Sequence, residues 1–202
     1  ILLTGLKALE YRGYDSVGVA IHTKDGIQVY KDIGRIENLR KSIGKEKSFL
    51  GIGHTRWATH GIPNKINAHP HQSSDGRFIL VHNGIINNED ELKDRYFSNH
   101  TFISETDSEL IAELLSYYVN KYHEVDLSIR HLMNILKGSY ALAILDKFDT
   151  NRFYVVKNKS PLLIGIGDEF NMVASDQIAL INETNKLYEL KDLEYAIISQ
   201  NK

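Results

Sequence analysis

The sequence contains no cysteine, and this absence excludes several kinds of chemistry within its 202 residues. These residues can form no disulfide, no thiolate metal site and no cysteine nucleophile. Long hydrophobic runs are absent too: none approaches the roughly 18 apolar residues of a membrane-spanning helix, and no signal-peptide pattern opens the chain. We therefore expect no membrane partner, and the lack of cysteine is compatible with a cytoplasmic protein.

Neither sign of charge is in excess. The 24 Lys and Arg residues against 26 Asp and Glu residues give a net charge of -2. This balance provides no overall attraction to nucleic acid, so we expect no nucleic-acid partner. The hydrophobic content of 42% is ordinary for a globular protein. No repeat or linker divides the chain, and a single domain over residues 1–202 is the simplest organisation.

Both ends of the sequence fall within or next to apolar patterns. The chain begins Ile1-Leu2-Leu3 rather than with methionine, and it stops just after Ile197-Ile198. We interpret it as a piece of a longer polypeptide.

The spacing of apolar residues predicts a mixed fold. Leu2 to Tyr11 has helical spacing, and Lys24-Asp25-Gly26 predicts a hairpin turn between two strands. Residues 106–109 match a capping box that opens a helix. Other helices are expected over 38–47, 88–96 and 127–136, and strands over 50–55, 78–82, 140–145, 152–157, 162–166, 170–174 and 195–198. Grouped strands and paired helices favour an α+β fold with antiparallel sheets.

Polar segments interrupt this pattern next to regular elements, where a scaffold positions functional groups. In the segment 53–61, Arg56 offers a planar fork of donors suited to a carboxylate or phosphate. Thr59 and His60 add a hydroxyl and an imidazole. The alternative is a surface loop in which Arg56 pairs with a neighbouring acid and Trp57 belongs to the core.

Two further segments allow both a structural and a functional interpretation. Asn83-Gly84 is a common hairpin-turn pair, but an Asn amide and a Gly N–H also suit an oxyanion hole for acyl transfer. Asp107 follows the N-cap candidate Thr106, where an acid favours the helix dipole. The functional alternative is that it holds a substrate ammonium group. Arg12 and Asp15 could form an ordinary surface pair.

The histidines give little support for a metal site. His54, His60, His69, His71 and His82 have no acidic or cysteine ligand at a recognised spacing. We expect no metal and no cofactor, and we find no glycine-rich phosphate loop.

Taken in order, the polar segments resemble one family. They read EYRGYDS at 10–16, HTRWATHG at 54–61, NAHPH at 67–71, HNGII at 82–86, SETD at 104–107 and ASDQ at 174–177. This series is similar to the glutaminase domain of the glutamine–fructose-6-phosphate aminotransferase (isomerising), or glucosamine-6-phosphate synthase, family. Amidophosphoribosyltransferase and asparagine synthetase share the general plan but have different sequences in the corresponding motifs. The same domain of another amidotransferase is therefore an alternative.

The resemblance implies an N-terminal-nucleophile hydrolase fold, a four-layer αββα sandwich with antiparallel sheets. It also implies that an N-terminal cysteine attacks the glutamine side-chain amide and that ammonia leaves. Arg56, with Thr59 and His60, would bind the glutamine α-carboxylate, and Asp107 would hold the α-ammonium. Asn83 and Gly84 would form the oxyanion hole. Trp57 would lie on the closing loop at the ammonia exit, and Arg12 would support the nucleophile.

The sequence departs from the family at the nucleophile. That cysteine and its strand would lie upstream of Ile1, so a catalytically inert glutamine-binding fragment is the alternative. The resemblance further implies downstream sugar-isomerase domains that bind fructose 6-phosphate, a homo-oligomer formed through those domains, and a role in hexosamine biosynthesis that supplies the UDP-GlcNAc precursor.

Overall fold

The computed structural model describes residues 1–43, 48–57 and 61–199. Its helices are α1 Leu2–Leu9, η1 Glu10–Arg12, α2 Ile36–Ser42, α3 Glu89–Phe97, α4 Asp107–Tyr122, α5 Val125–Ile135 and η2 Gln177–Ala179. Its strands are β1 Ser16–Thr23, β2 Gly26–Ile33, β3 Gly51–Arg56, β4 His71–Gln72, β5 Phe78–Ile86, β6 Gly138–Asp146, β7 Arg152–Asn158, β8 Leu163–Ile166, β9 Asn171–Ala174, β10 Leu187–Glu189 and β11 Glu194–Ser199. Among these residues, no helix is long and apolar enough to cross a membrane.

Within the described residues the strands form three antiparallel sheets. One has the order β11-β7-β6-β5-β4, and the two smaller ones have the orders β2-β1-β3 and β10-β8-β9. The β1–β2 hairpin turns at Lys24-Asp25, as predicted, and its register pairs Thr23 with Gly26.

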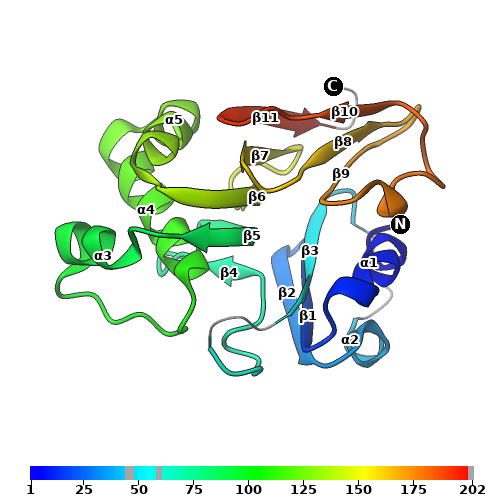
Figure 1. The fold of residues 1–202 in the computed structure, drawn as a ribbon, viewed down its shortest axis with the longest axis horizontal. Helices are drawn as coiled ribbons and strands as arrows, with labels where there is room; N and C mark the ends of the chain where they lie inside the picture. The colour runs from blue at the N-terminus through cyan, green and yellow to red at the C-terminus, as the bar shows by residue number, and fades with distance from the viewer. Residues whose placement is uncertain (44–47, 58–60, 200–202) are drawn as a thin grey trace.

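Alternate residues of the central strands face two different hydrophobic cores. Figure 1 shows the resulting layers of helices and sheets. Leu80, Leu142 and Tyr154 pack with α4 and α5 on one face of the five-stranded sheet. On the other face, Val81, Ala141 and Phe153 belong to a core shared with the smaller sheets. α1 and α2 cover the outer face of β1 with Leu6, Ile36 and Leu39. The order helix, sheet, sheet, helix confirms the predicted αββα sandwich.

Most predicted elements are confirmed, but two local predictions are wrong. The strand expected over 78–82 continues to Ile86, because each residue of β5 through Ile86 pairs with β6. Asn83-Gly84 is therefore not a hairpin turn. The capping box at 106–109 does not form either: Thr106 makes no side-chain cap bond, and Glu109 instead accepts the N–H groups of Ile103 and Ser104.

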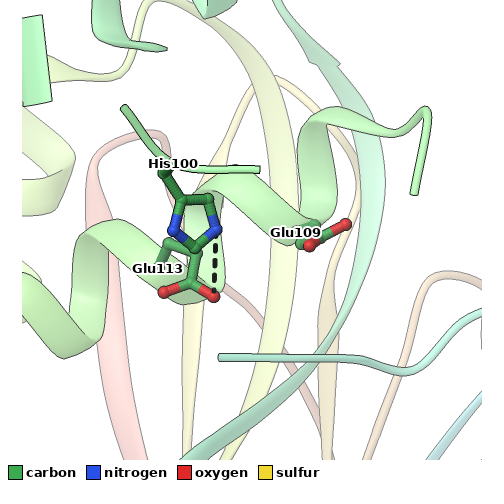
Figure 2. A group of neighbouring side chains, drawn as sticks. All are labelled: His100, Glu109 and Glu113. Carbon is green, nitrogen blue, oxygen red and sulfur yellow. Dashed lines mark ion pairs between the residues drawn. The ribbon is translucent and has the colours of Figure 1, made fainter. Parts of the chain in front are cut away.

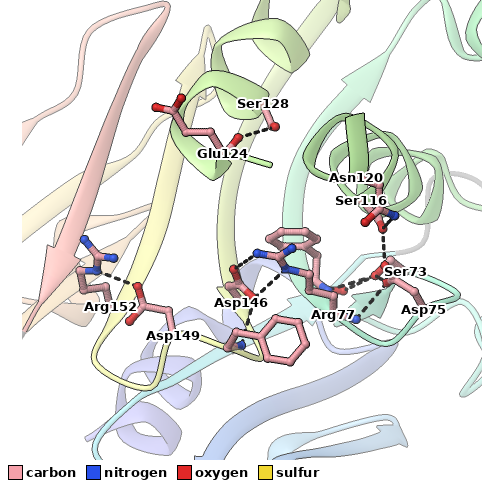
Figure 3. Close-up of polar contacts among 12 residues, drawn as sticks. Ser73, Asp75, Arg77, Ser116, Asn120, Glu124, Ser128, Asp146, Asp149 and Arg152 are labelled. Atoms are coloured by element: carbon pink, nitrogen blue, oxygen red, sulfur yellow. Dashed lines mark hydrogen bonds and ion pairs between the residues drawn. The ribbon is translucent and has the colours of Figure 1, made fainter. Parts of the chain in front are cut away.

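Polar contacts fasten the far end of the five-stranded sheet (Figure 3). Arg77 donates two hydrogen bonds to Asp146, at 3.1 and 3.0 Å, across the β5–β6 pair. Ser73 and Ser116 both donate to Asp75, which joins the β4–β5 turn to α4. The contact between Ser116 and Asp75 holds α4 against the β4–β5 turn. The N-terminus of the same helix reaches the functional site.

Candidate active site

A cleft of about 1210 Å³ lies between the smaller sheets and the five-stranded sheet. It brings together all the predicted site residues that the structure describes: Arg12, Arg56, Trp57, Asn83, Gly84 and Asp107. Thr59 and His60 lie outside the described residues, so their predicted roles stay untested. Six positions up to 95 residues apart in the sequence thus meet at one cleft, because η1, β3, β5 and the start of α4 all contribute to its lining.

Asn83 and Gly84 lie within β5 rather than in a turn. Gly84 has a φ of +139°, and a Cβ at this position would lie 2.0 Å from the Ser139 carbonyl oxygen. Only glycine fits this close approach between β5 and β6. Gly84 is exposed and Asn83 half-buried, and both face the cleft.

Arg56 and Asp107 supply opposite charges to the cleft. Arg56 ends β3 and is 6% exposed, which corrects the alternative of a surface arginine. Burial lowers the pKa of the Arg56 guanidinium, while the carboxylates of Asp15, Asp107 and Glu105 act in the opposite direction. The group stays charged at any physiological pH, since no protein environment deprotonates arginine.

Asp107 is the first residue of α4 and is held from several directions. Its Oδ2 accepts the Ile86 N–H at 2.8 Å, and its Oδ1 lies 3.4 Å from His82 Nδ1. Burial acts to raise the pKa of this carboxyl, but the hydrogen bond and electrostatic attraction of His82 and the hydrogen bonds from Ile86 and Ser108 outweigh burial, so its pKa lies below its usual range. Asp107 is therefore a fixed anion at neutral pH.

Two residues that the sequence did not single out connect the walls of the cleft. Asn67 is buried and bonds to Glu105, which precedes the N-cap of α4. Glu105 Oε2 also accepts the Ile62 N–H at 3.3 Å. In the sequence, Asn67 stands out only as the first residue of the NAHPH motif at 67–71. Its burial in a proline-flanked polar loop gives no periodic signal that would have identified it.

Trp57 is 55% exposed, and this contradicts the alternative that it belongs to the core. Its ring meets Tyr14 edge to face, with centroids 5.5 Å apart. Trp57 also lines the cleft, so its exposed ring lies at the rim.

Arg12 does not pair with Asp15. Its guanidinium donates to Ser175 Oγ at 2.8 Å and lies 3.6 Å from Asp176 Oδ2. Tyr11 also donates to Asp176, at 2.9 Å. Arg12 thus joins the segment after α1 to the 174–177 motif at the opposite rim of the cleft.

Two groups of side chains could suggest a metal site. The rings of His54 and His69 are tilted, with centroids 4.2 Å apart, and those of His69 and His71 meet edge to face at 4.7 Å. Among the described residues these histidines do not form a group of potential metal-ligand atoms. The ligand atoms of His100, Glu109 and Glu113 lie within 4.8 Å of one another (Figure 2). Both carboxylates are already engaged by backbone N–H groups, Glu109 at Ile103 and Ser104 and Glu113 at Ser74. Glu109 therefore holds the loop before α4, and Glu113 holds the turn between β4 and β5.

Comparison with known proteins identifies the family of the chain. Residues 54–182 match a family described as a glutamine amidotransferase domain. The chain is 50% identical, over 202 residues, to the glutamine–fructose-6-phosphate aminotransferase (isomerising) of Halalkalibacterium halodurans, covering all of this chain and 34% of the relative. The homologue of that name from Bacillus cereus is also 50% identical, over 99% of this chain and 34% of its own length. The chain thus spans about a third of these relatives.

A solved structure shares the fold. The glutamine phosphoribosylpyrophosphate amidotransferase of B. subtilis superposes with a TM-score of 0.83 at 25% identity, over 98% of this chain and 44% of that one.

Proposed function

Because the chain belongs to the glutamine amidotransferase family, we propose that it is the glutamine-hydrolysing domain of a glutamine–fructose-6-phosphate aminotransferase, with residues 1–202 as that domain. The sequence identity supports this assignment over the full chain. The observation that carries the proposed chemistry is the placement of one buried cation, one fixed anion and an Asn-Gly pair around a single cleft.

The two charges match a free amino acid. We propose that Arg56 binds the α-carboxylate, helped by Thr59 and His60, and that Asp107 binds the α-ammonium. A free amino acid carries these two opposite charges at a fixed separation, so one cationic fork and one carboxylate recognise it. A ligand that lacks either charge leaves a partner unpaired, at a cost of about 2–5 kcal/mol.

The reaction needs a nucleophile, which the resemblance supplies as a cysteine at the start of an additional strand. The edges of β3 and β9 both border the cleft, and within the described residues each pairs on one side only, with β1 and with β8. A strand between these edges would join the two smaller sheets into one. It would also bring a thiol beside Asn83, with Arg12 at the rim in a supporting role.

In the proposed mechanism the cysteine sulfur bonds to the side-chain amide carbon of glutamine, and the carbonyl oxygen becomes an oxyanion. The Asn83 NH₂ and the Gly84 N–H stabilise that charge. The α-amino group of the cysteine takes the thiol proton as the sulfur attacks and passes it to the leaving nitrogen, so the C–N bond breaks, ammonia leaves and a thioester remains. Water then adds to the thioester carbon and the C–S bond breaks, which gives glutamate and the free thiol. Trp57 covers the bound amino acid at the ammonia exit.

The fate of the ammonia concerns the whole protein. We propose that it reaches fructose 6-phosphate on sugar-isomerase domains, in a cytoplasmic homo-oligomer that serves hexosamine biosynthesis. The support is the activity for which the relatives are named, and this chain covers about one third of their length.

The test is glutamate release from L-glutamine by the full-length protein that contains this chain. Asp107→Asn should raise the KM for glutamine about 30-fold or more, since it removes one of the paired charges. Asp168→Asn is the control, because Asp168 is 96% exposed and lies away from the cleft. No glutamate release by the unmodified protein would contradict the proposal and favour an inert glutamine-binding module.

A further inference from the structure

We infer that His54 is a positioning residue, whose Nε2–H holds the carbonyl oxygen of the Asn83 side chain and thereby turns the Asn83 NH₂ toward the cleft. The inference rests on the proposed function, because it assigns the direction of the amide that would stabilise the oxyanion.

The contact joins two sheets at the site. His54 lies on β3 of a small sheet, and Asn83 lies on β5 of the five-stranded sheet. Their side chains meet with His54 Nε2 2.7 Å from Asn83 Oδ1. This is a short, well-formed hydrogen bond between the layers that enclose the cleft.

The other ring nitrogen decides which atom carries the proton. His54 Nδ1 is buried and has no hydrogen-bond partner among the described residues. A buried N–H without an acceptor is rarer and costlier than a buried lone pair without a donor. The proton therefore resides on Nε2, Nδ1 is bare, and Nε2 donates.

The direction of the Asn83 amide follows from that proton. A donor at 2.7 Å requires the amide oxygen, not the NH₂, on the side of His54. Both hydrogens of the NH₂ then lie on the opposite side. In the described part of the chain this NH₂ makes no hydrogen bond, and Asn83 borders the cleft, so both donors are available to a ligand.

The imidazole is suited to this task because it is neutral and packed. Burial lowers the pKa of His54 to about 4, so the ring keeps one proton at neutral pH. The buried ring of His69 lies against it, with centroids 4.2 Å apart, which opposes rotation of His54. His54 and Arg56 are two residues apart on β3 and therefore share a face of the strand. One strand thus fixes both the carboxylate-binding group and the orientation of the oxyanion donor.

The first experiment reads the tautomer directly. Long-range ¹H–¹⁵N spectra of the chain should show His54 as the neutral Nε2–H form at neutral pH, and Asn83→Ala should perturb the Nε2 resonance. A neutral Nδ1–H form, or a charged ring at neutral pH, would overturn the inference whatever the enzyme does.

The second experiment uses glutaminase kinetics of the full-length protein. His54→Ala should lower kcat about 10- to 100-fold and leave the KM for glutamine within about twofold, because a misdirected donor is felt mainly in the transition state. His54→Gln should restore most of the rate, since the glutamine Nε2 can donate from nearly the same place. His54→Ala should have no further effect in the Asn83→Ala background.

The outcomes separate this inference from the proposed function. An impaired Asn83→Ala with a fully active His54→Ala would overturn the inference alone. A fully active Asn83→Ala would overturn the oxyanion role of Asn83 and the inference with it. If His54→Ala fails to fold, the His54→Gln variant and the tautomer measurement still test the inference. The inference is contradicted if His54→Gln folds but has a low kcat and the unmodified chain shows the Nδ1–H tautomer.

Discussion

Asn67 and Glu105 hold each other in both directions. The Asn67 NH₂ donates to Glu105 Oε2 at 2.8 Å, and the Glu105 backbone N–H donates to Asn67 Oδ1 at 2.9 Å. The first residue comes from the loop that follows β3 and Arg56, and the second from the turn before α4 and Asp107. This reciprocal pair therefore ties the loop that follows Arg56 to the turn that precedes Asp107.

Breaking that pair should weaken glutamine binding. Asn67→Ala leaves Glu105 without one of its donors and frees the loop, so we expect the KM for glutamine to rise about tenfold while kcat changes much less, which corresponds to about 1.4 kcal/mol. The measurement is steady-state glutamate release by the full-length protein. Asn38→Ala is a matched control, because Asn38 donates to the Ile33 carbonyl and does not line the cleft. An unchanged KM in Asn67→Ala would show that the pair does not support glutamine binding.

Loss of the Asn83 amide should affect rate rather than affinity. Asn83→Ala removes a donor that acts on the oxyanion, so kcat should fall about 10²- to 10³-fold with little change in KM. The measurement is again glutamate release, with glutamine affinity checked by calorimetry. A large loss of affinity with unchanged turnover would contradict the role of Asn83.

Gly84 should not tolerate any side chain. Its φ of +139° and the 2.0 Å approach of Ser139 O mean that Gly84→Ala meets both backbone strain and a clash. Gly26→Ala is the matched control: its φ is +103°, but nothing lies within 4 Å of its Cβ position. Gly26→Ala should cost about 1 kcal/mol of unfolding free energy, and Gly84→Ala distinctly more. The measurement is urea unfolding of both variants. An equal loss of unfolding free energy in Gly84→Ala and Gly26→Ala would contradict the prediction, since it would mean that β5 and β6 move apart at no cost to admit the Cβ.

The sequence predicted the fold well where apolar spacing is regular. The helix predicted to open at residues 106–109 is present as α4, and the Asp25-Gly26 hairpin is in place. It failed where polar residues continue a strand: Asn83-Gly84 is typical of a turn in isolation, and only pairing with β6 shows otherwise. Two short strands, β4 and β10, were not predicted, since two or three residues carry too little periodicity.

The site was predictable as a set of residue types but not as a set of contacts. Arg56 and Asp107 were identified by charge and position, and the structure places both on the cleft. The residues that hold the site together were not identified from the sequence, because they bond to partners far along the chain. His54 bonds to Asn83, 29 residues away, and Asn67 bonds to Glu105, 38 residues away. No local pattern records such a pairing. The same limit explains why Arg12 was first matched with its neighbour Asp15 and not with Ser175, 163 residues away.

The buried histidines should make the folded state sensitive to mild acid. Burial lowers the pKa of His54 to about 4 and that of His71 to about 3, from an ordinary value of 6.5. Between about pH 6.5 and pH 4 the unfolded chain binds protons that the folded chain excludes, so the free energy of unfolding falls as the pH falls. At about pH 5 each histidine should cost on the order of 2 kcal/mol relative to neutral pH.

Urea unfolding of the chain at about pH 7.5 and about pH 5 tests this pH dependence against matched variants. His54→Gln removes one titrating group next to His69, His82 and Arg56, and it keeps a donor for Asn83. It should therefore lose less stability on acidification than the unmodified chain, by roughly the contribution of one histidine. His123→Asn is the control, since His123 is exposed at the αL end of α4, a backbone conformation that asparagine also tolerates. If His54→Gln and His123→Asn lose the same stability as the unmodified chain, His54 is not held neutral by burial and the acid sensitivity arises elsewhere.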